Sequence, residues 1–126
     1  MAQPTLLSIA KADLISAGRL VEDEDKFIKH QAAYFVQQSI EKTLKYLIYL
    51  KTGTQSWGHD IAKLIMQARQ LGIQVPKEID SHKTVYTSWE AVTRYYPQEI
   101  IRRDAIKRAI AATKQWHVDL TKQGIR

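Results

Sequence analysis

The spacing of apolar residues predicts one long central helix, over about residues 25–51. On a projection of about 100° per residue, apolar side chains fill more than half of the circumference of its part 32–50. A helix with a single neighbour shows a narrower apolar stripe, so we expect this one to pack on more than one flank. The apolar positions are Ala32, Ala33, Phe35, Val36, Ile40, Leu44, Tyr46, Leu47, Ile48 and Leu50.

The remaining strip of this helix is polar. Gln37, Glu41 and Lys45 follow one another at intervals of four residues, beside Gln38 and Lys42. Glu41 has the favourable spacing for an ion pair with Lys45. The pattern therefore favours a core helix with a solvated polar strip. In the alternative interpretation Glu41 acts as a base and Lys42 or Lys45 contacts a phosphate.

The same periodicity predicts four further helices and no strand. Gly53 and Gly72 are typical of helix ends, Ser56 is a possible cap, and Pro76 and Pro97 are each expected to open a helix. The sequence thus indicates an all-α, antiparallel, up-and-down bundle of about five helices, forming a single domain over residues 1–126. The four further helices are expected at about residues 6–21, 58–71, 76–96 and 98–122.

Composition excludes several classes of site. The 126 residues include no cysteine, which rules out disulfides, thiolate metal sites and cysteine nucleophiles. The apolar runs are too short to cross a bilayer, and the first residues show no signal peptide, so we expect a cytoplasmic protein. The net charge is +6, and residues 102–126 hold seven basic and two acidic side chains. Such a basic helix can attract phosphates or can simply be solvated.

Four short motifs follow one another along the chain. They are Ala12-Asp13-Leu14, the run from Gln37 to Lys45, His59-Asp60-Ile61-x-x-Leu64, and Arg94-Tyr95-Tyr96-Pro97. In this order and spacing the chain resembles the HEPN domain family, named for higher eukaryotes and prokaryotes and linked to nucleotide binding. The resemblance covers essentially the whole chain. It implies a helical bundle that is commonly a homodimer.

The resemblance also implies a function. Many HEPN domains pair with a minimal nucleotidyltransferase in two-gene modules of toxin–antitoxin type, and many are metal-independent ribonucleases. The ribonucleases carry an arginine followed, after four to six residues, by a histidine, and no Arg–His pair here has that spacing. We therefore expect a nucleotide- or RNA-binding module rather than an enzyme. The alternatives are a ribonuclease that uses Arg94, His59 and Glu41, and a non-catalytic interaction scaffold.

Arg94 is the first candidate for phosphate binding, because its guanidinium can hold a phosphate through two hydrogen bonds. It matches the arginine of the Arg-Tyr-Pro segment of the family. Tyr95 or Tyr96 is a candidate for stacking on a base, with core packing as the alternative role. Lys42, Lys45 and Arg102 are further candidates for phosphate contacts. In the alternative interpretation Arg94 pairs with Glu41 or Glu90.

His59 and Asp60, with Glu41, form a possible polar site. His59 and Asp60 lie in the first turn of the helix predicted at about residues 58–71, where an anion or a metal ion can bind. A carboxylate also suits the first turn of a helix without any ligand. Two isolated ligands do not make a metal site, so we expect no metal and no cofactor.

Overall fold

The structure is a computed structural model that describes residues 5–126. The expectation of no signal peptide concerns the N-terminal segment. Residues 1–4 of that segment lie outside the described residues. The predicted all-α class is confirmed, since the described residues form helices and no strand. The helices are α1 (Leu6–Leu20), α2 (Lys26–Thr52), α3 (Ile61–Gln70), α4 (Lys77–Ser81), α5 (Lys83–Tyr95) and α6 (Arg103–Lys122).

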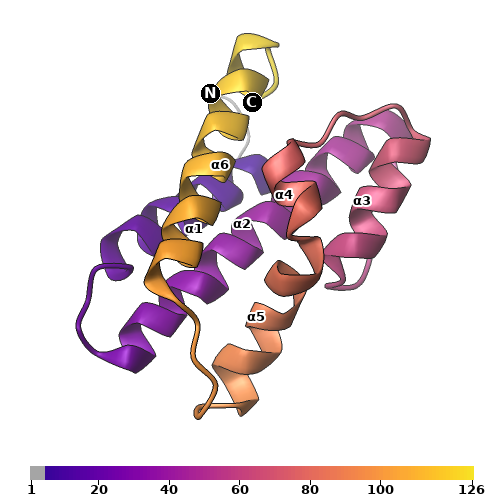
Figure 1. Cartoon of the computed structure of the whole chain (residues 1–126). Coiled ribbons are helices and arrows are strands. Elements are labelled where there is room, and N and C mark those ends of the chain that lie inside the picture. Colours follow the sequence, from indigo (N-terminus) through magenta and orange to yellow (C-terminus); the bar gives the residue numbers. More distant parts are fainter. Residues whose placement is uncertain (1–4) are drawn as a thin grey trace.

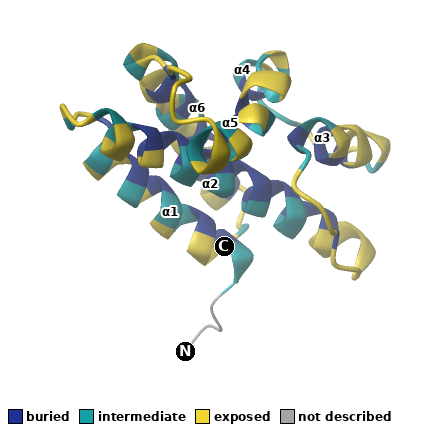
Figure 2. Cartoon of the chain, turned by 90° about the horizontal axis from the view of Figure 1, so that it is seen from below, coloured by how far each residue is buried: buried dark blue, intermediate teal, exposed yellow. Residues whose placement is uncertain are grey.

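Helix α2 is the centre of the bundle, as predicted. It packs against α1, α3, α5 and α6, and it runs through the middle of the molecule in Figure 1. Val36, Ile40, Leu44 and Ile48 on its apolar side are fully buried. Figure 2 shows buried residues following α2 along much of its length. A wide apolar surface on one helix therefore determines that the others surround it.

The ends of α2 follow from local chemistry. The Asp25 side chain accepts hydrogen bonds from the backbone N–H groups of Phe27 and Ile28, which have no partner within the helix. Gly53 ends the helix with a φ of 72°, a conformation that costs glycine no steric strain. Both boundaries lie within a residue or so of those predicted.

The predicted helix 76–96 is two helices, which gives six helices instead of five. The break is at His82, whose backbone N–H bonds to Ile79 O rather than continuing the α-helical ladder. The His82 imidazole lies 2.9 Å from Glu78 O through Nδ1, so the side chain takes the carbonyl that the backbone N–H of residue 82 would otherwise use. Competition between a side chain and the backbone thus divides the helix.

Two other boundaries differ from the prediction. Helix α3 begins at Ile61 and is capped by Asp60 rather than Ser56, because the Asp60 carboxylate accepts from Lys63 N. Helix α6 begins at Arg103, after an irregular segment at 97–102. Leu50, predicted on the apolar side of the central helix, is 50% exposed.

No helix among residues 5–126 combines the length and the apolar character that a membrane crossing requires.

Two histidines are buried in the bundle. His30 Nε2 accepts from the backbone N–H of Ile101, and so ties the segment before α6 to α2. His117 Nε2 lies 2.9 Å from Thr43 Oγ1. The Thr43 hydroxyl already donates its hydrogen to Ser39 O, so His117 donates from Nε2. His30 is neutral because its Nε2 accepts, and burial favours the neutral form of His117.

Burial lowers the pKa of His117 from 6.5 to about 4, with a smaller contribution from the charge of Lys11, and burial lowers the pKa of His30. The unfolded chain then binds more protons than the folded chain between pH 6.5 and 4, so stability is complete above pH 6.5 and falls as the pH falls through this window. We expect His117 to reduce the free energy of unfolding by about 2 kcal/mol between pH 7.5 and 5.

Urea unfolding at the two pH values measures this loss. The His117→Gln variant keeps a donor for Thr43 but does not titrate, so its loss over the same interval should be smaller by about that amount. An equal loss in both proteins would contradict the assignment of His117.

Candidate functional site

A group of charged side chains lies where α2, the loop before α3, and α5 meet. We call Glu41, Lys45, His59, Glu90 and Arg94 the polar cluster. Glu41 is only 2% exposed, and its helical neighbour Gln37 is fully buried. The predicted solvated strip on α2 is therefore wrong at these two positions, because α3, α5 and the loop between α2 and α3 pack over it.

The Glu41 carboxylate fixes the orientation of His59. Its Oε1 lies 2.9 Å from His59 Nδ1. A carboxylate can only accept, so Nδ1 carries the hydrogen, and in the neutral ring Nε2 carries the lone pair. The His59 side chain is 64% exposed, whereas that of Glu41 is 3% exposed. The pair thus lets a buried carboxylate orient an exposed histidine ring.

The loop that carries His59 is anchored on both sides of this residue. The backbone N–H of Ile61 donates to Thr87 Oγ1 of α5 at 3.1 Å, which joins the start of α3 to α5. Gly58, directly before His59, has a φ of 97°, which L side chains rarely adopt. A glycine turn and a hydrogen bond between helices therefore determine where His59 lies.

Two further groups surround Glu41. Lys45 Nζ lies 3.5 Å from Glu41 Oε2, and the Lys45 side chain is only 12% exposed. Gln37 Nε2 donates to Glu41 Oε1 at 3.4 Å, and Gln38 Nε2 in turn donates to Gln37 Oε1. The predicted Glu41–Lys45 pair is confirmed, but it is buried rather than exposed. A buried carboxylate needs such partners, since leaving it unpaired would cost several kcal/mol.

Arg94 lies at the edge of the polar cluster. Its Nη1 is 3.7 Å from Glu90 Oε1, and its guanidinium lies over the Tyr34 ring, 5.7 Å from the centroid. The predicted alternative pairing with Glu90 is thus found, and no contact with Glu41 accompanies it within residues 5–126. The long 3.5 Å contact with the Tyr34 hydroxyl raises the pKa of Arg94, so the group stays charged. Half of the side chain is exposed.

Three of these residues have the spacing of metal ligands. One ligand atom each from Glu41, His59 and Glu90 lies within 4.8 Å of the others. A metal ion there would lie close to Lys45 and Arg94, each of which already faces one of the two carboxylates. Two positive side chains against two carboxylates leave no excess negative charge for a dication. The balanced charges therefore do not favour a metal ion, whereas the half-exposed Arg94 can still donate to an anion.

The other predicted site residues lie apart from the polar cluster. Lys42 turns to α1, where its Nζ is 2.6 Å from Asp13 Oδ2. Asp60 caps α3. Tyr95 is 71% exposed, and Arg102, at the start of α6, is exposed with its Nε 3.7 Å from Asp104. The structure thus gives Lys42 and Asp60 local structural contacts and leaves Tyr95 and Arg102 on the surface.

Sequence analysis missed the contribution of Tyr34 and did not expect Gln37 to be buried. Tyr34, Gln37, Glu41 and Lys45 recur at intervals of three or four residues, so they share one side of α2. That periodicity was available from the sequence. The partners on α5 were not, because residues 41 and 90 meet only through the packing of separate helices.

The Lys42–Asp13 ion pair is expected to contribute to stability and not to function, so replacing either partner should destabilise the fold. Both side chains are mostly buried, so we expect Lys42→Met to lower the free energy of unfolding by about 1–2 kcal/mol. Asp13→Asn should have a similar effect, and the double variant should lose less than the sum of the two. Urea unfolding of the four proteins gives the coupling energy. Additive losses would show that the two side chains do not interact.

Comparison with known proteins identifies the family. The family model described as "HEPN domain" matches residues 4–117, which is most of the chain. No curated protein and no solved structure matches. The matched range contains all of the motifs on which the resemblance rests and every residue of the polar cluster. The chain therefore belongs to the HEPN domain family.

Proposed function

We propose that this chain binds the phosphate groups of RNA or of a nucleotide at the polar cluster, through Arg94 and His59. The observation that carries the proposal is that both side chains are at least half exposed while their partners, Glu90 and Glu41, are mostly buried. The carboxylates of Glu90 and Glu41 lie on the buried side of Arg94 and His59 and hold these two side chains in place. The exposed parts of both side chains are open to a ligand: Arg94 donates in every case, and His59 donates to a phosphate from Nε2 when its ring is doubly protonated.

The geometry of Arg94 suits a phosphate. Its contacts with Glu90 and Tyr34 are 3.7 and 3.5 Å long, too long to satisfy the five N–H donors of the guanidinium. A phosphate oxygen can therefore accept from the outer edge without breaking a strong internal bond. Tyr95, which follows Arg94 and is largely exposed, is available for stacking on a base.

Arg94→Ala tests this proposal. We expect affinity for a fluorescein-labelled, single-stranded RNA, measured by anisotropy at low salt, to fall at least tenfold. Arg94→Lys keeps the charge but loses the two-pronged geometry, and should bind with intermediate affinity. The free energy of unfolding should change by no more than about 0.5 kcal/mol, because the ion pair with Glu90 is long and partly exposed.

The matched control is Arg108→Ala, an exposed arginine of α6 outside the polar cluster. It should change the affinity by no more than twofold. Equal losses in the Arg94 and Arg108 variants would mean that binding follows net charge alone and would overturn the proposed site. The same titrations with ATP and GTP distinguish a free nucleotide from RNA.

A second candidate function is metal-independent RNA cleavage, and the Glu41–His59 pair favours it. The neutral His59 ring carries its lone pair on Nε2 and is oriented by a buried carboxylate, the arrangement used by general bases. In this scheme Nε2 takes the proton of a ribose 2′-hydroxyl. The 2′ oxygen then bonds to phosphorus, the bond to the 5′ oxygen breaks, and that oxygen takes a proton from water. Arg94 stabilises the charge on the phosphate.

Incubation of the protein with the same RNA in excess EDTA tests for cleavage. Cleaved RNA that stays intact with His59→Ala or with a 2′-deoxy substrate would support the second function. His59→Ala is assayed at RNA concentrations that saturate the variant, so that weaker binding does not account for a loss of cleavage. If the parent protein leaves the RNA intact, the cleavage proposal fails and only the binding proposal stands.

We also propose, from membership of the family, a homodimer that works with a minimal nucleotidyltransferase in a toxin–antitoxin type module. Size-exclusion chromatography with light scattering measures the first part. A single species of about twice the mass of the chain supports the homodimer. Co-purification with a neighbouring nucleotidyltransferase would support the second part, and a monomer that binds no such protein would contradict both.

A further inference from the structure

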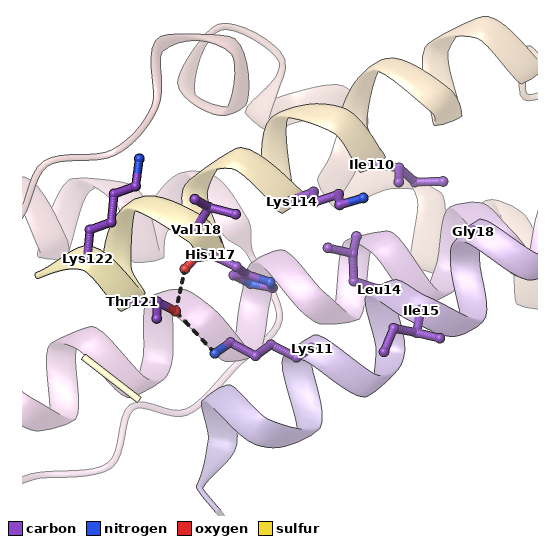
Figure 3. A pocket seen from close by; sticks show the side chains of 10 residues that line it. All are labelled: Lys11, Leu14, Ile15, Gly18, Ile110, Lys114, His117, Val118, Thr121 and Lys122. Atoms are coloured by element: carbon purple, nitrogen blue, oxygen red, sulfur yellow. Dashed lines mark hydrogen bonds between the residues drawn. The ribbon is translucent and has the colours of Figure 1, made fainter. Parts of the chain in front are cut away.

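An open groove lies between α1 and α6, on a part of the molecule that the polar cluster does not reach. Its volume is about 530 Å³. Leu14 and Ile15 of α1 line it together with Ile110 and Val118 of α6, as Figure 3 shows. These side chains are aliphatic, and Ile15 is 57% and Val118 41% exposed. An apolar groove between two helices has the shape that receives the apolar face of another helix.

The rim of the groove is basic. Lys11 comes from α1, and Lys114 and Lys122 come from α6. Lys11 Nζ also reaches across to Thr121 Oγ1 of α6 at 3.4 Å. None of the described residues that line the groove is acidic, so these charges have no carboxylate among them. The groove thus combines an apolar floor with positive charge on both walls.

Gly18 leaves the backbone of α1 open on the side where a side chain would stand. It lies in the last turn of α1, where glycine is less stable than alanine. The helix does not need it as a terminator, because the C-cap is Val21 in an ordinary helical conformation. A Cβ atom built on Gly18 would meet nothing within 4 Å. Packing within the chain therefore does not require glycine here, and a larger side chain at position 18 has room to enter the open space.

We propose that the groove binds an amphipathic helix of a partner protein that has an apolar ridge and acidic residues on both sides of it. The apolar ridge would cover Leu14, Ile15 and Val118, and the carboxylates would pair with the lysines. From Ile110 to Lys122 the wall formed by α6 is about 18 Å long at 1.5 Å per residue. That length accommodates a helix of three to four turns.

Two other occupants fit the groove less well. A second copy of this chain, related by a two-fold axis, would bring the same three lysines together across the interface. An RNA strand would find no stacking surface, because the described lining residues include neither an aromatic side chain other than His117 nor an arginine. Charge and surface chemistry together therefore favour an acidic, apolar partner.

A designed 18-residue peptide tests the proposal. It carries leucines at i, i+4, i+7 and i+11, with glutamates beside them and a fluorescein label. A second peptide has the same composition with the leucines spread around the helix, and a third has lysine in place of glutamate. We expect the intact protein to bind the first peptide at least tenfold more tightly than either of the others in an anisotropy titration at low salt.

Variants then locate the binding site. Gly18→Leu should fill the groove and weaken binding at least tenfold without lowering the melting temperature, since its side chain enters open space. The charge reversals Lys11→Glu and Lys114→Glu should each weaken binding several-fold. Lys63→Glu, on the exposed surface of α3, is the charge-matched control and should change binding by no more than twofold.

Equal binding of the three peptides, or binding that Gly18→Leu leaves unchanged, would overturn the proposal. A dimer of the parent chain that Gly18→Leu converts to monomers would assign the groove to a second copy instead, and also overturns it. Release of the bound peptide by the single-stranded RNA would also overturn the proposal, because it would show that RNA competes for the groove. Because Arg94 lies outside the groove, Arg94→Ala should bind the peptide normally, so failure of the RNA proposal and failure of this one are distinguishable.

Discussion

The buried carboxylate of Glu41 is the constraint around which the polar side of this HEPN domain is arranged. It lies on the central helix, and a carboxylate removed from water must be paired. Its partners come from its own helix, in Lys45 and Gln37, and from the loop before α3, in His59. Satisfying this one group therefore fixes an exposed histidine against α2.

Helix α5 completes the arrangement by supplying positions that face this pair. Thr87 anchors the start of α3, and Glu90 lies beside both Glu41 and His59. One turn further along α5, Arg94 lies over the ring of Tyr34, which belongs to α2. Charges of both signs thus alternate from the interior to the surface, and the outermost groups are donors. This arrangement is the basis of the proposal of an anionic ligand.

The surface between α1 and α6 differs in character from the polar cluster. There the two helices leave an apolar groove with a basic rim, and the nearby buried polar group, His117, is satisfied internally by Thr43. Lys42 shows how sharply the two sides are separated, since it turns away from Lys45 and pairs with Asp13 of α1. The two proposed sites therefore lie on separate surfaces of the domain, and a variant of either can be made without touching the other.

Local signals determined the helices. Apolar periodicity, Asp25 and Gly53 set the extent of α2, and the order of the four motifs indicated the family before any contact was known. Signals of this kind failed at His82, where an imidazole competes with the backbone for Glu78 O. They also failed to identify the cap of α3, because Ser56 and Asp60 are both capable of capping and only the path of the loop distinguishes them.

The sequence by itself determined that Gln37, Glu41 and Lys45 share one side of a helix, because residues four apart on a helix are neighbours. Whether that side faces water depends on which other elements cover it. The loop before α3 and the side chains of α5 do so, and they turn an ordinary surface ion pair into a buried one that orients His59. Contacts between residues 41, 59 and 90 arise only when separate helices pack. Only the tertiary structure therefore decided which of the candidate residues form one site.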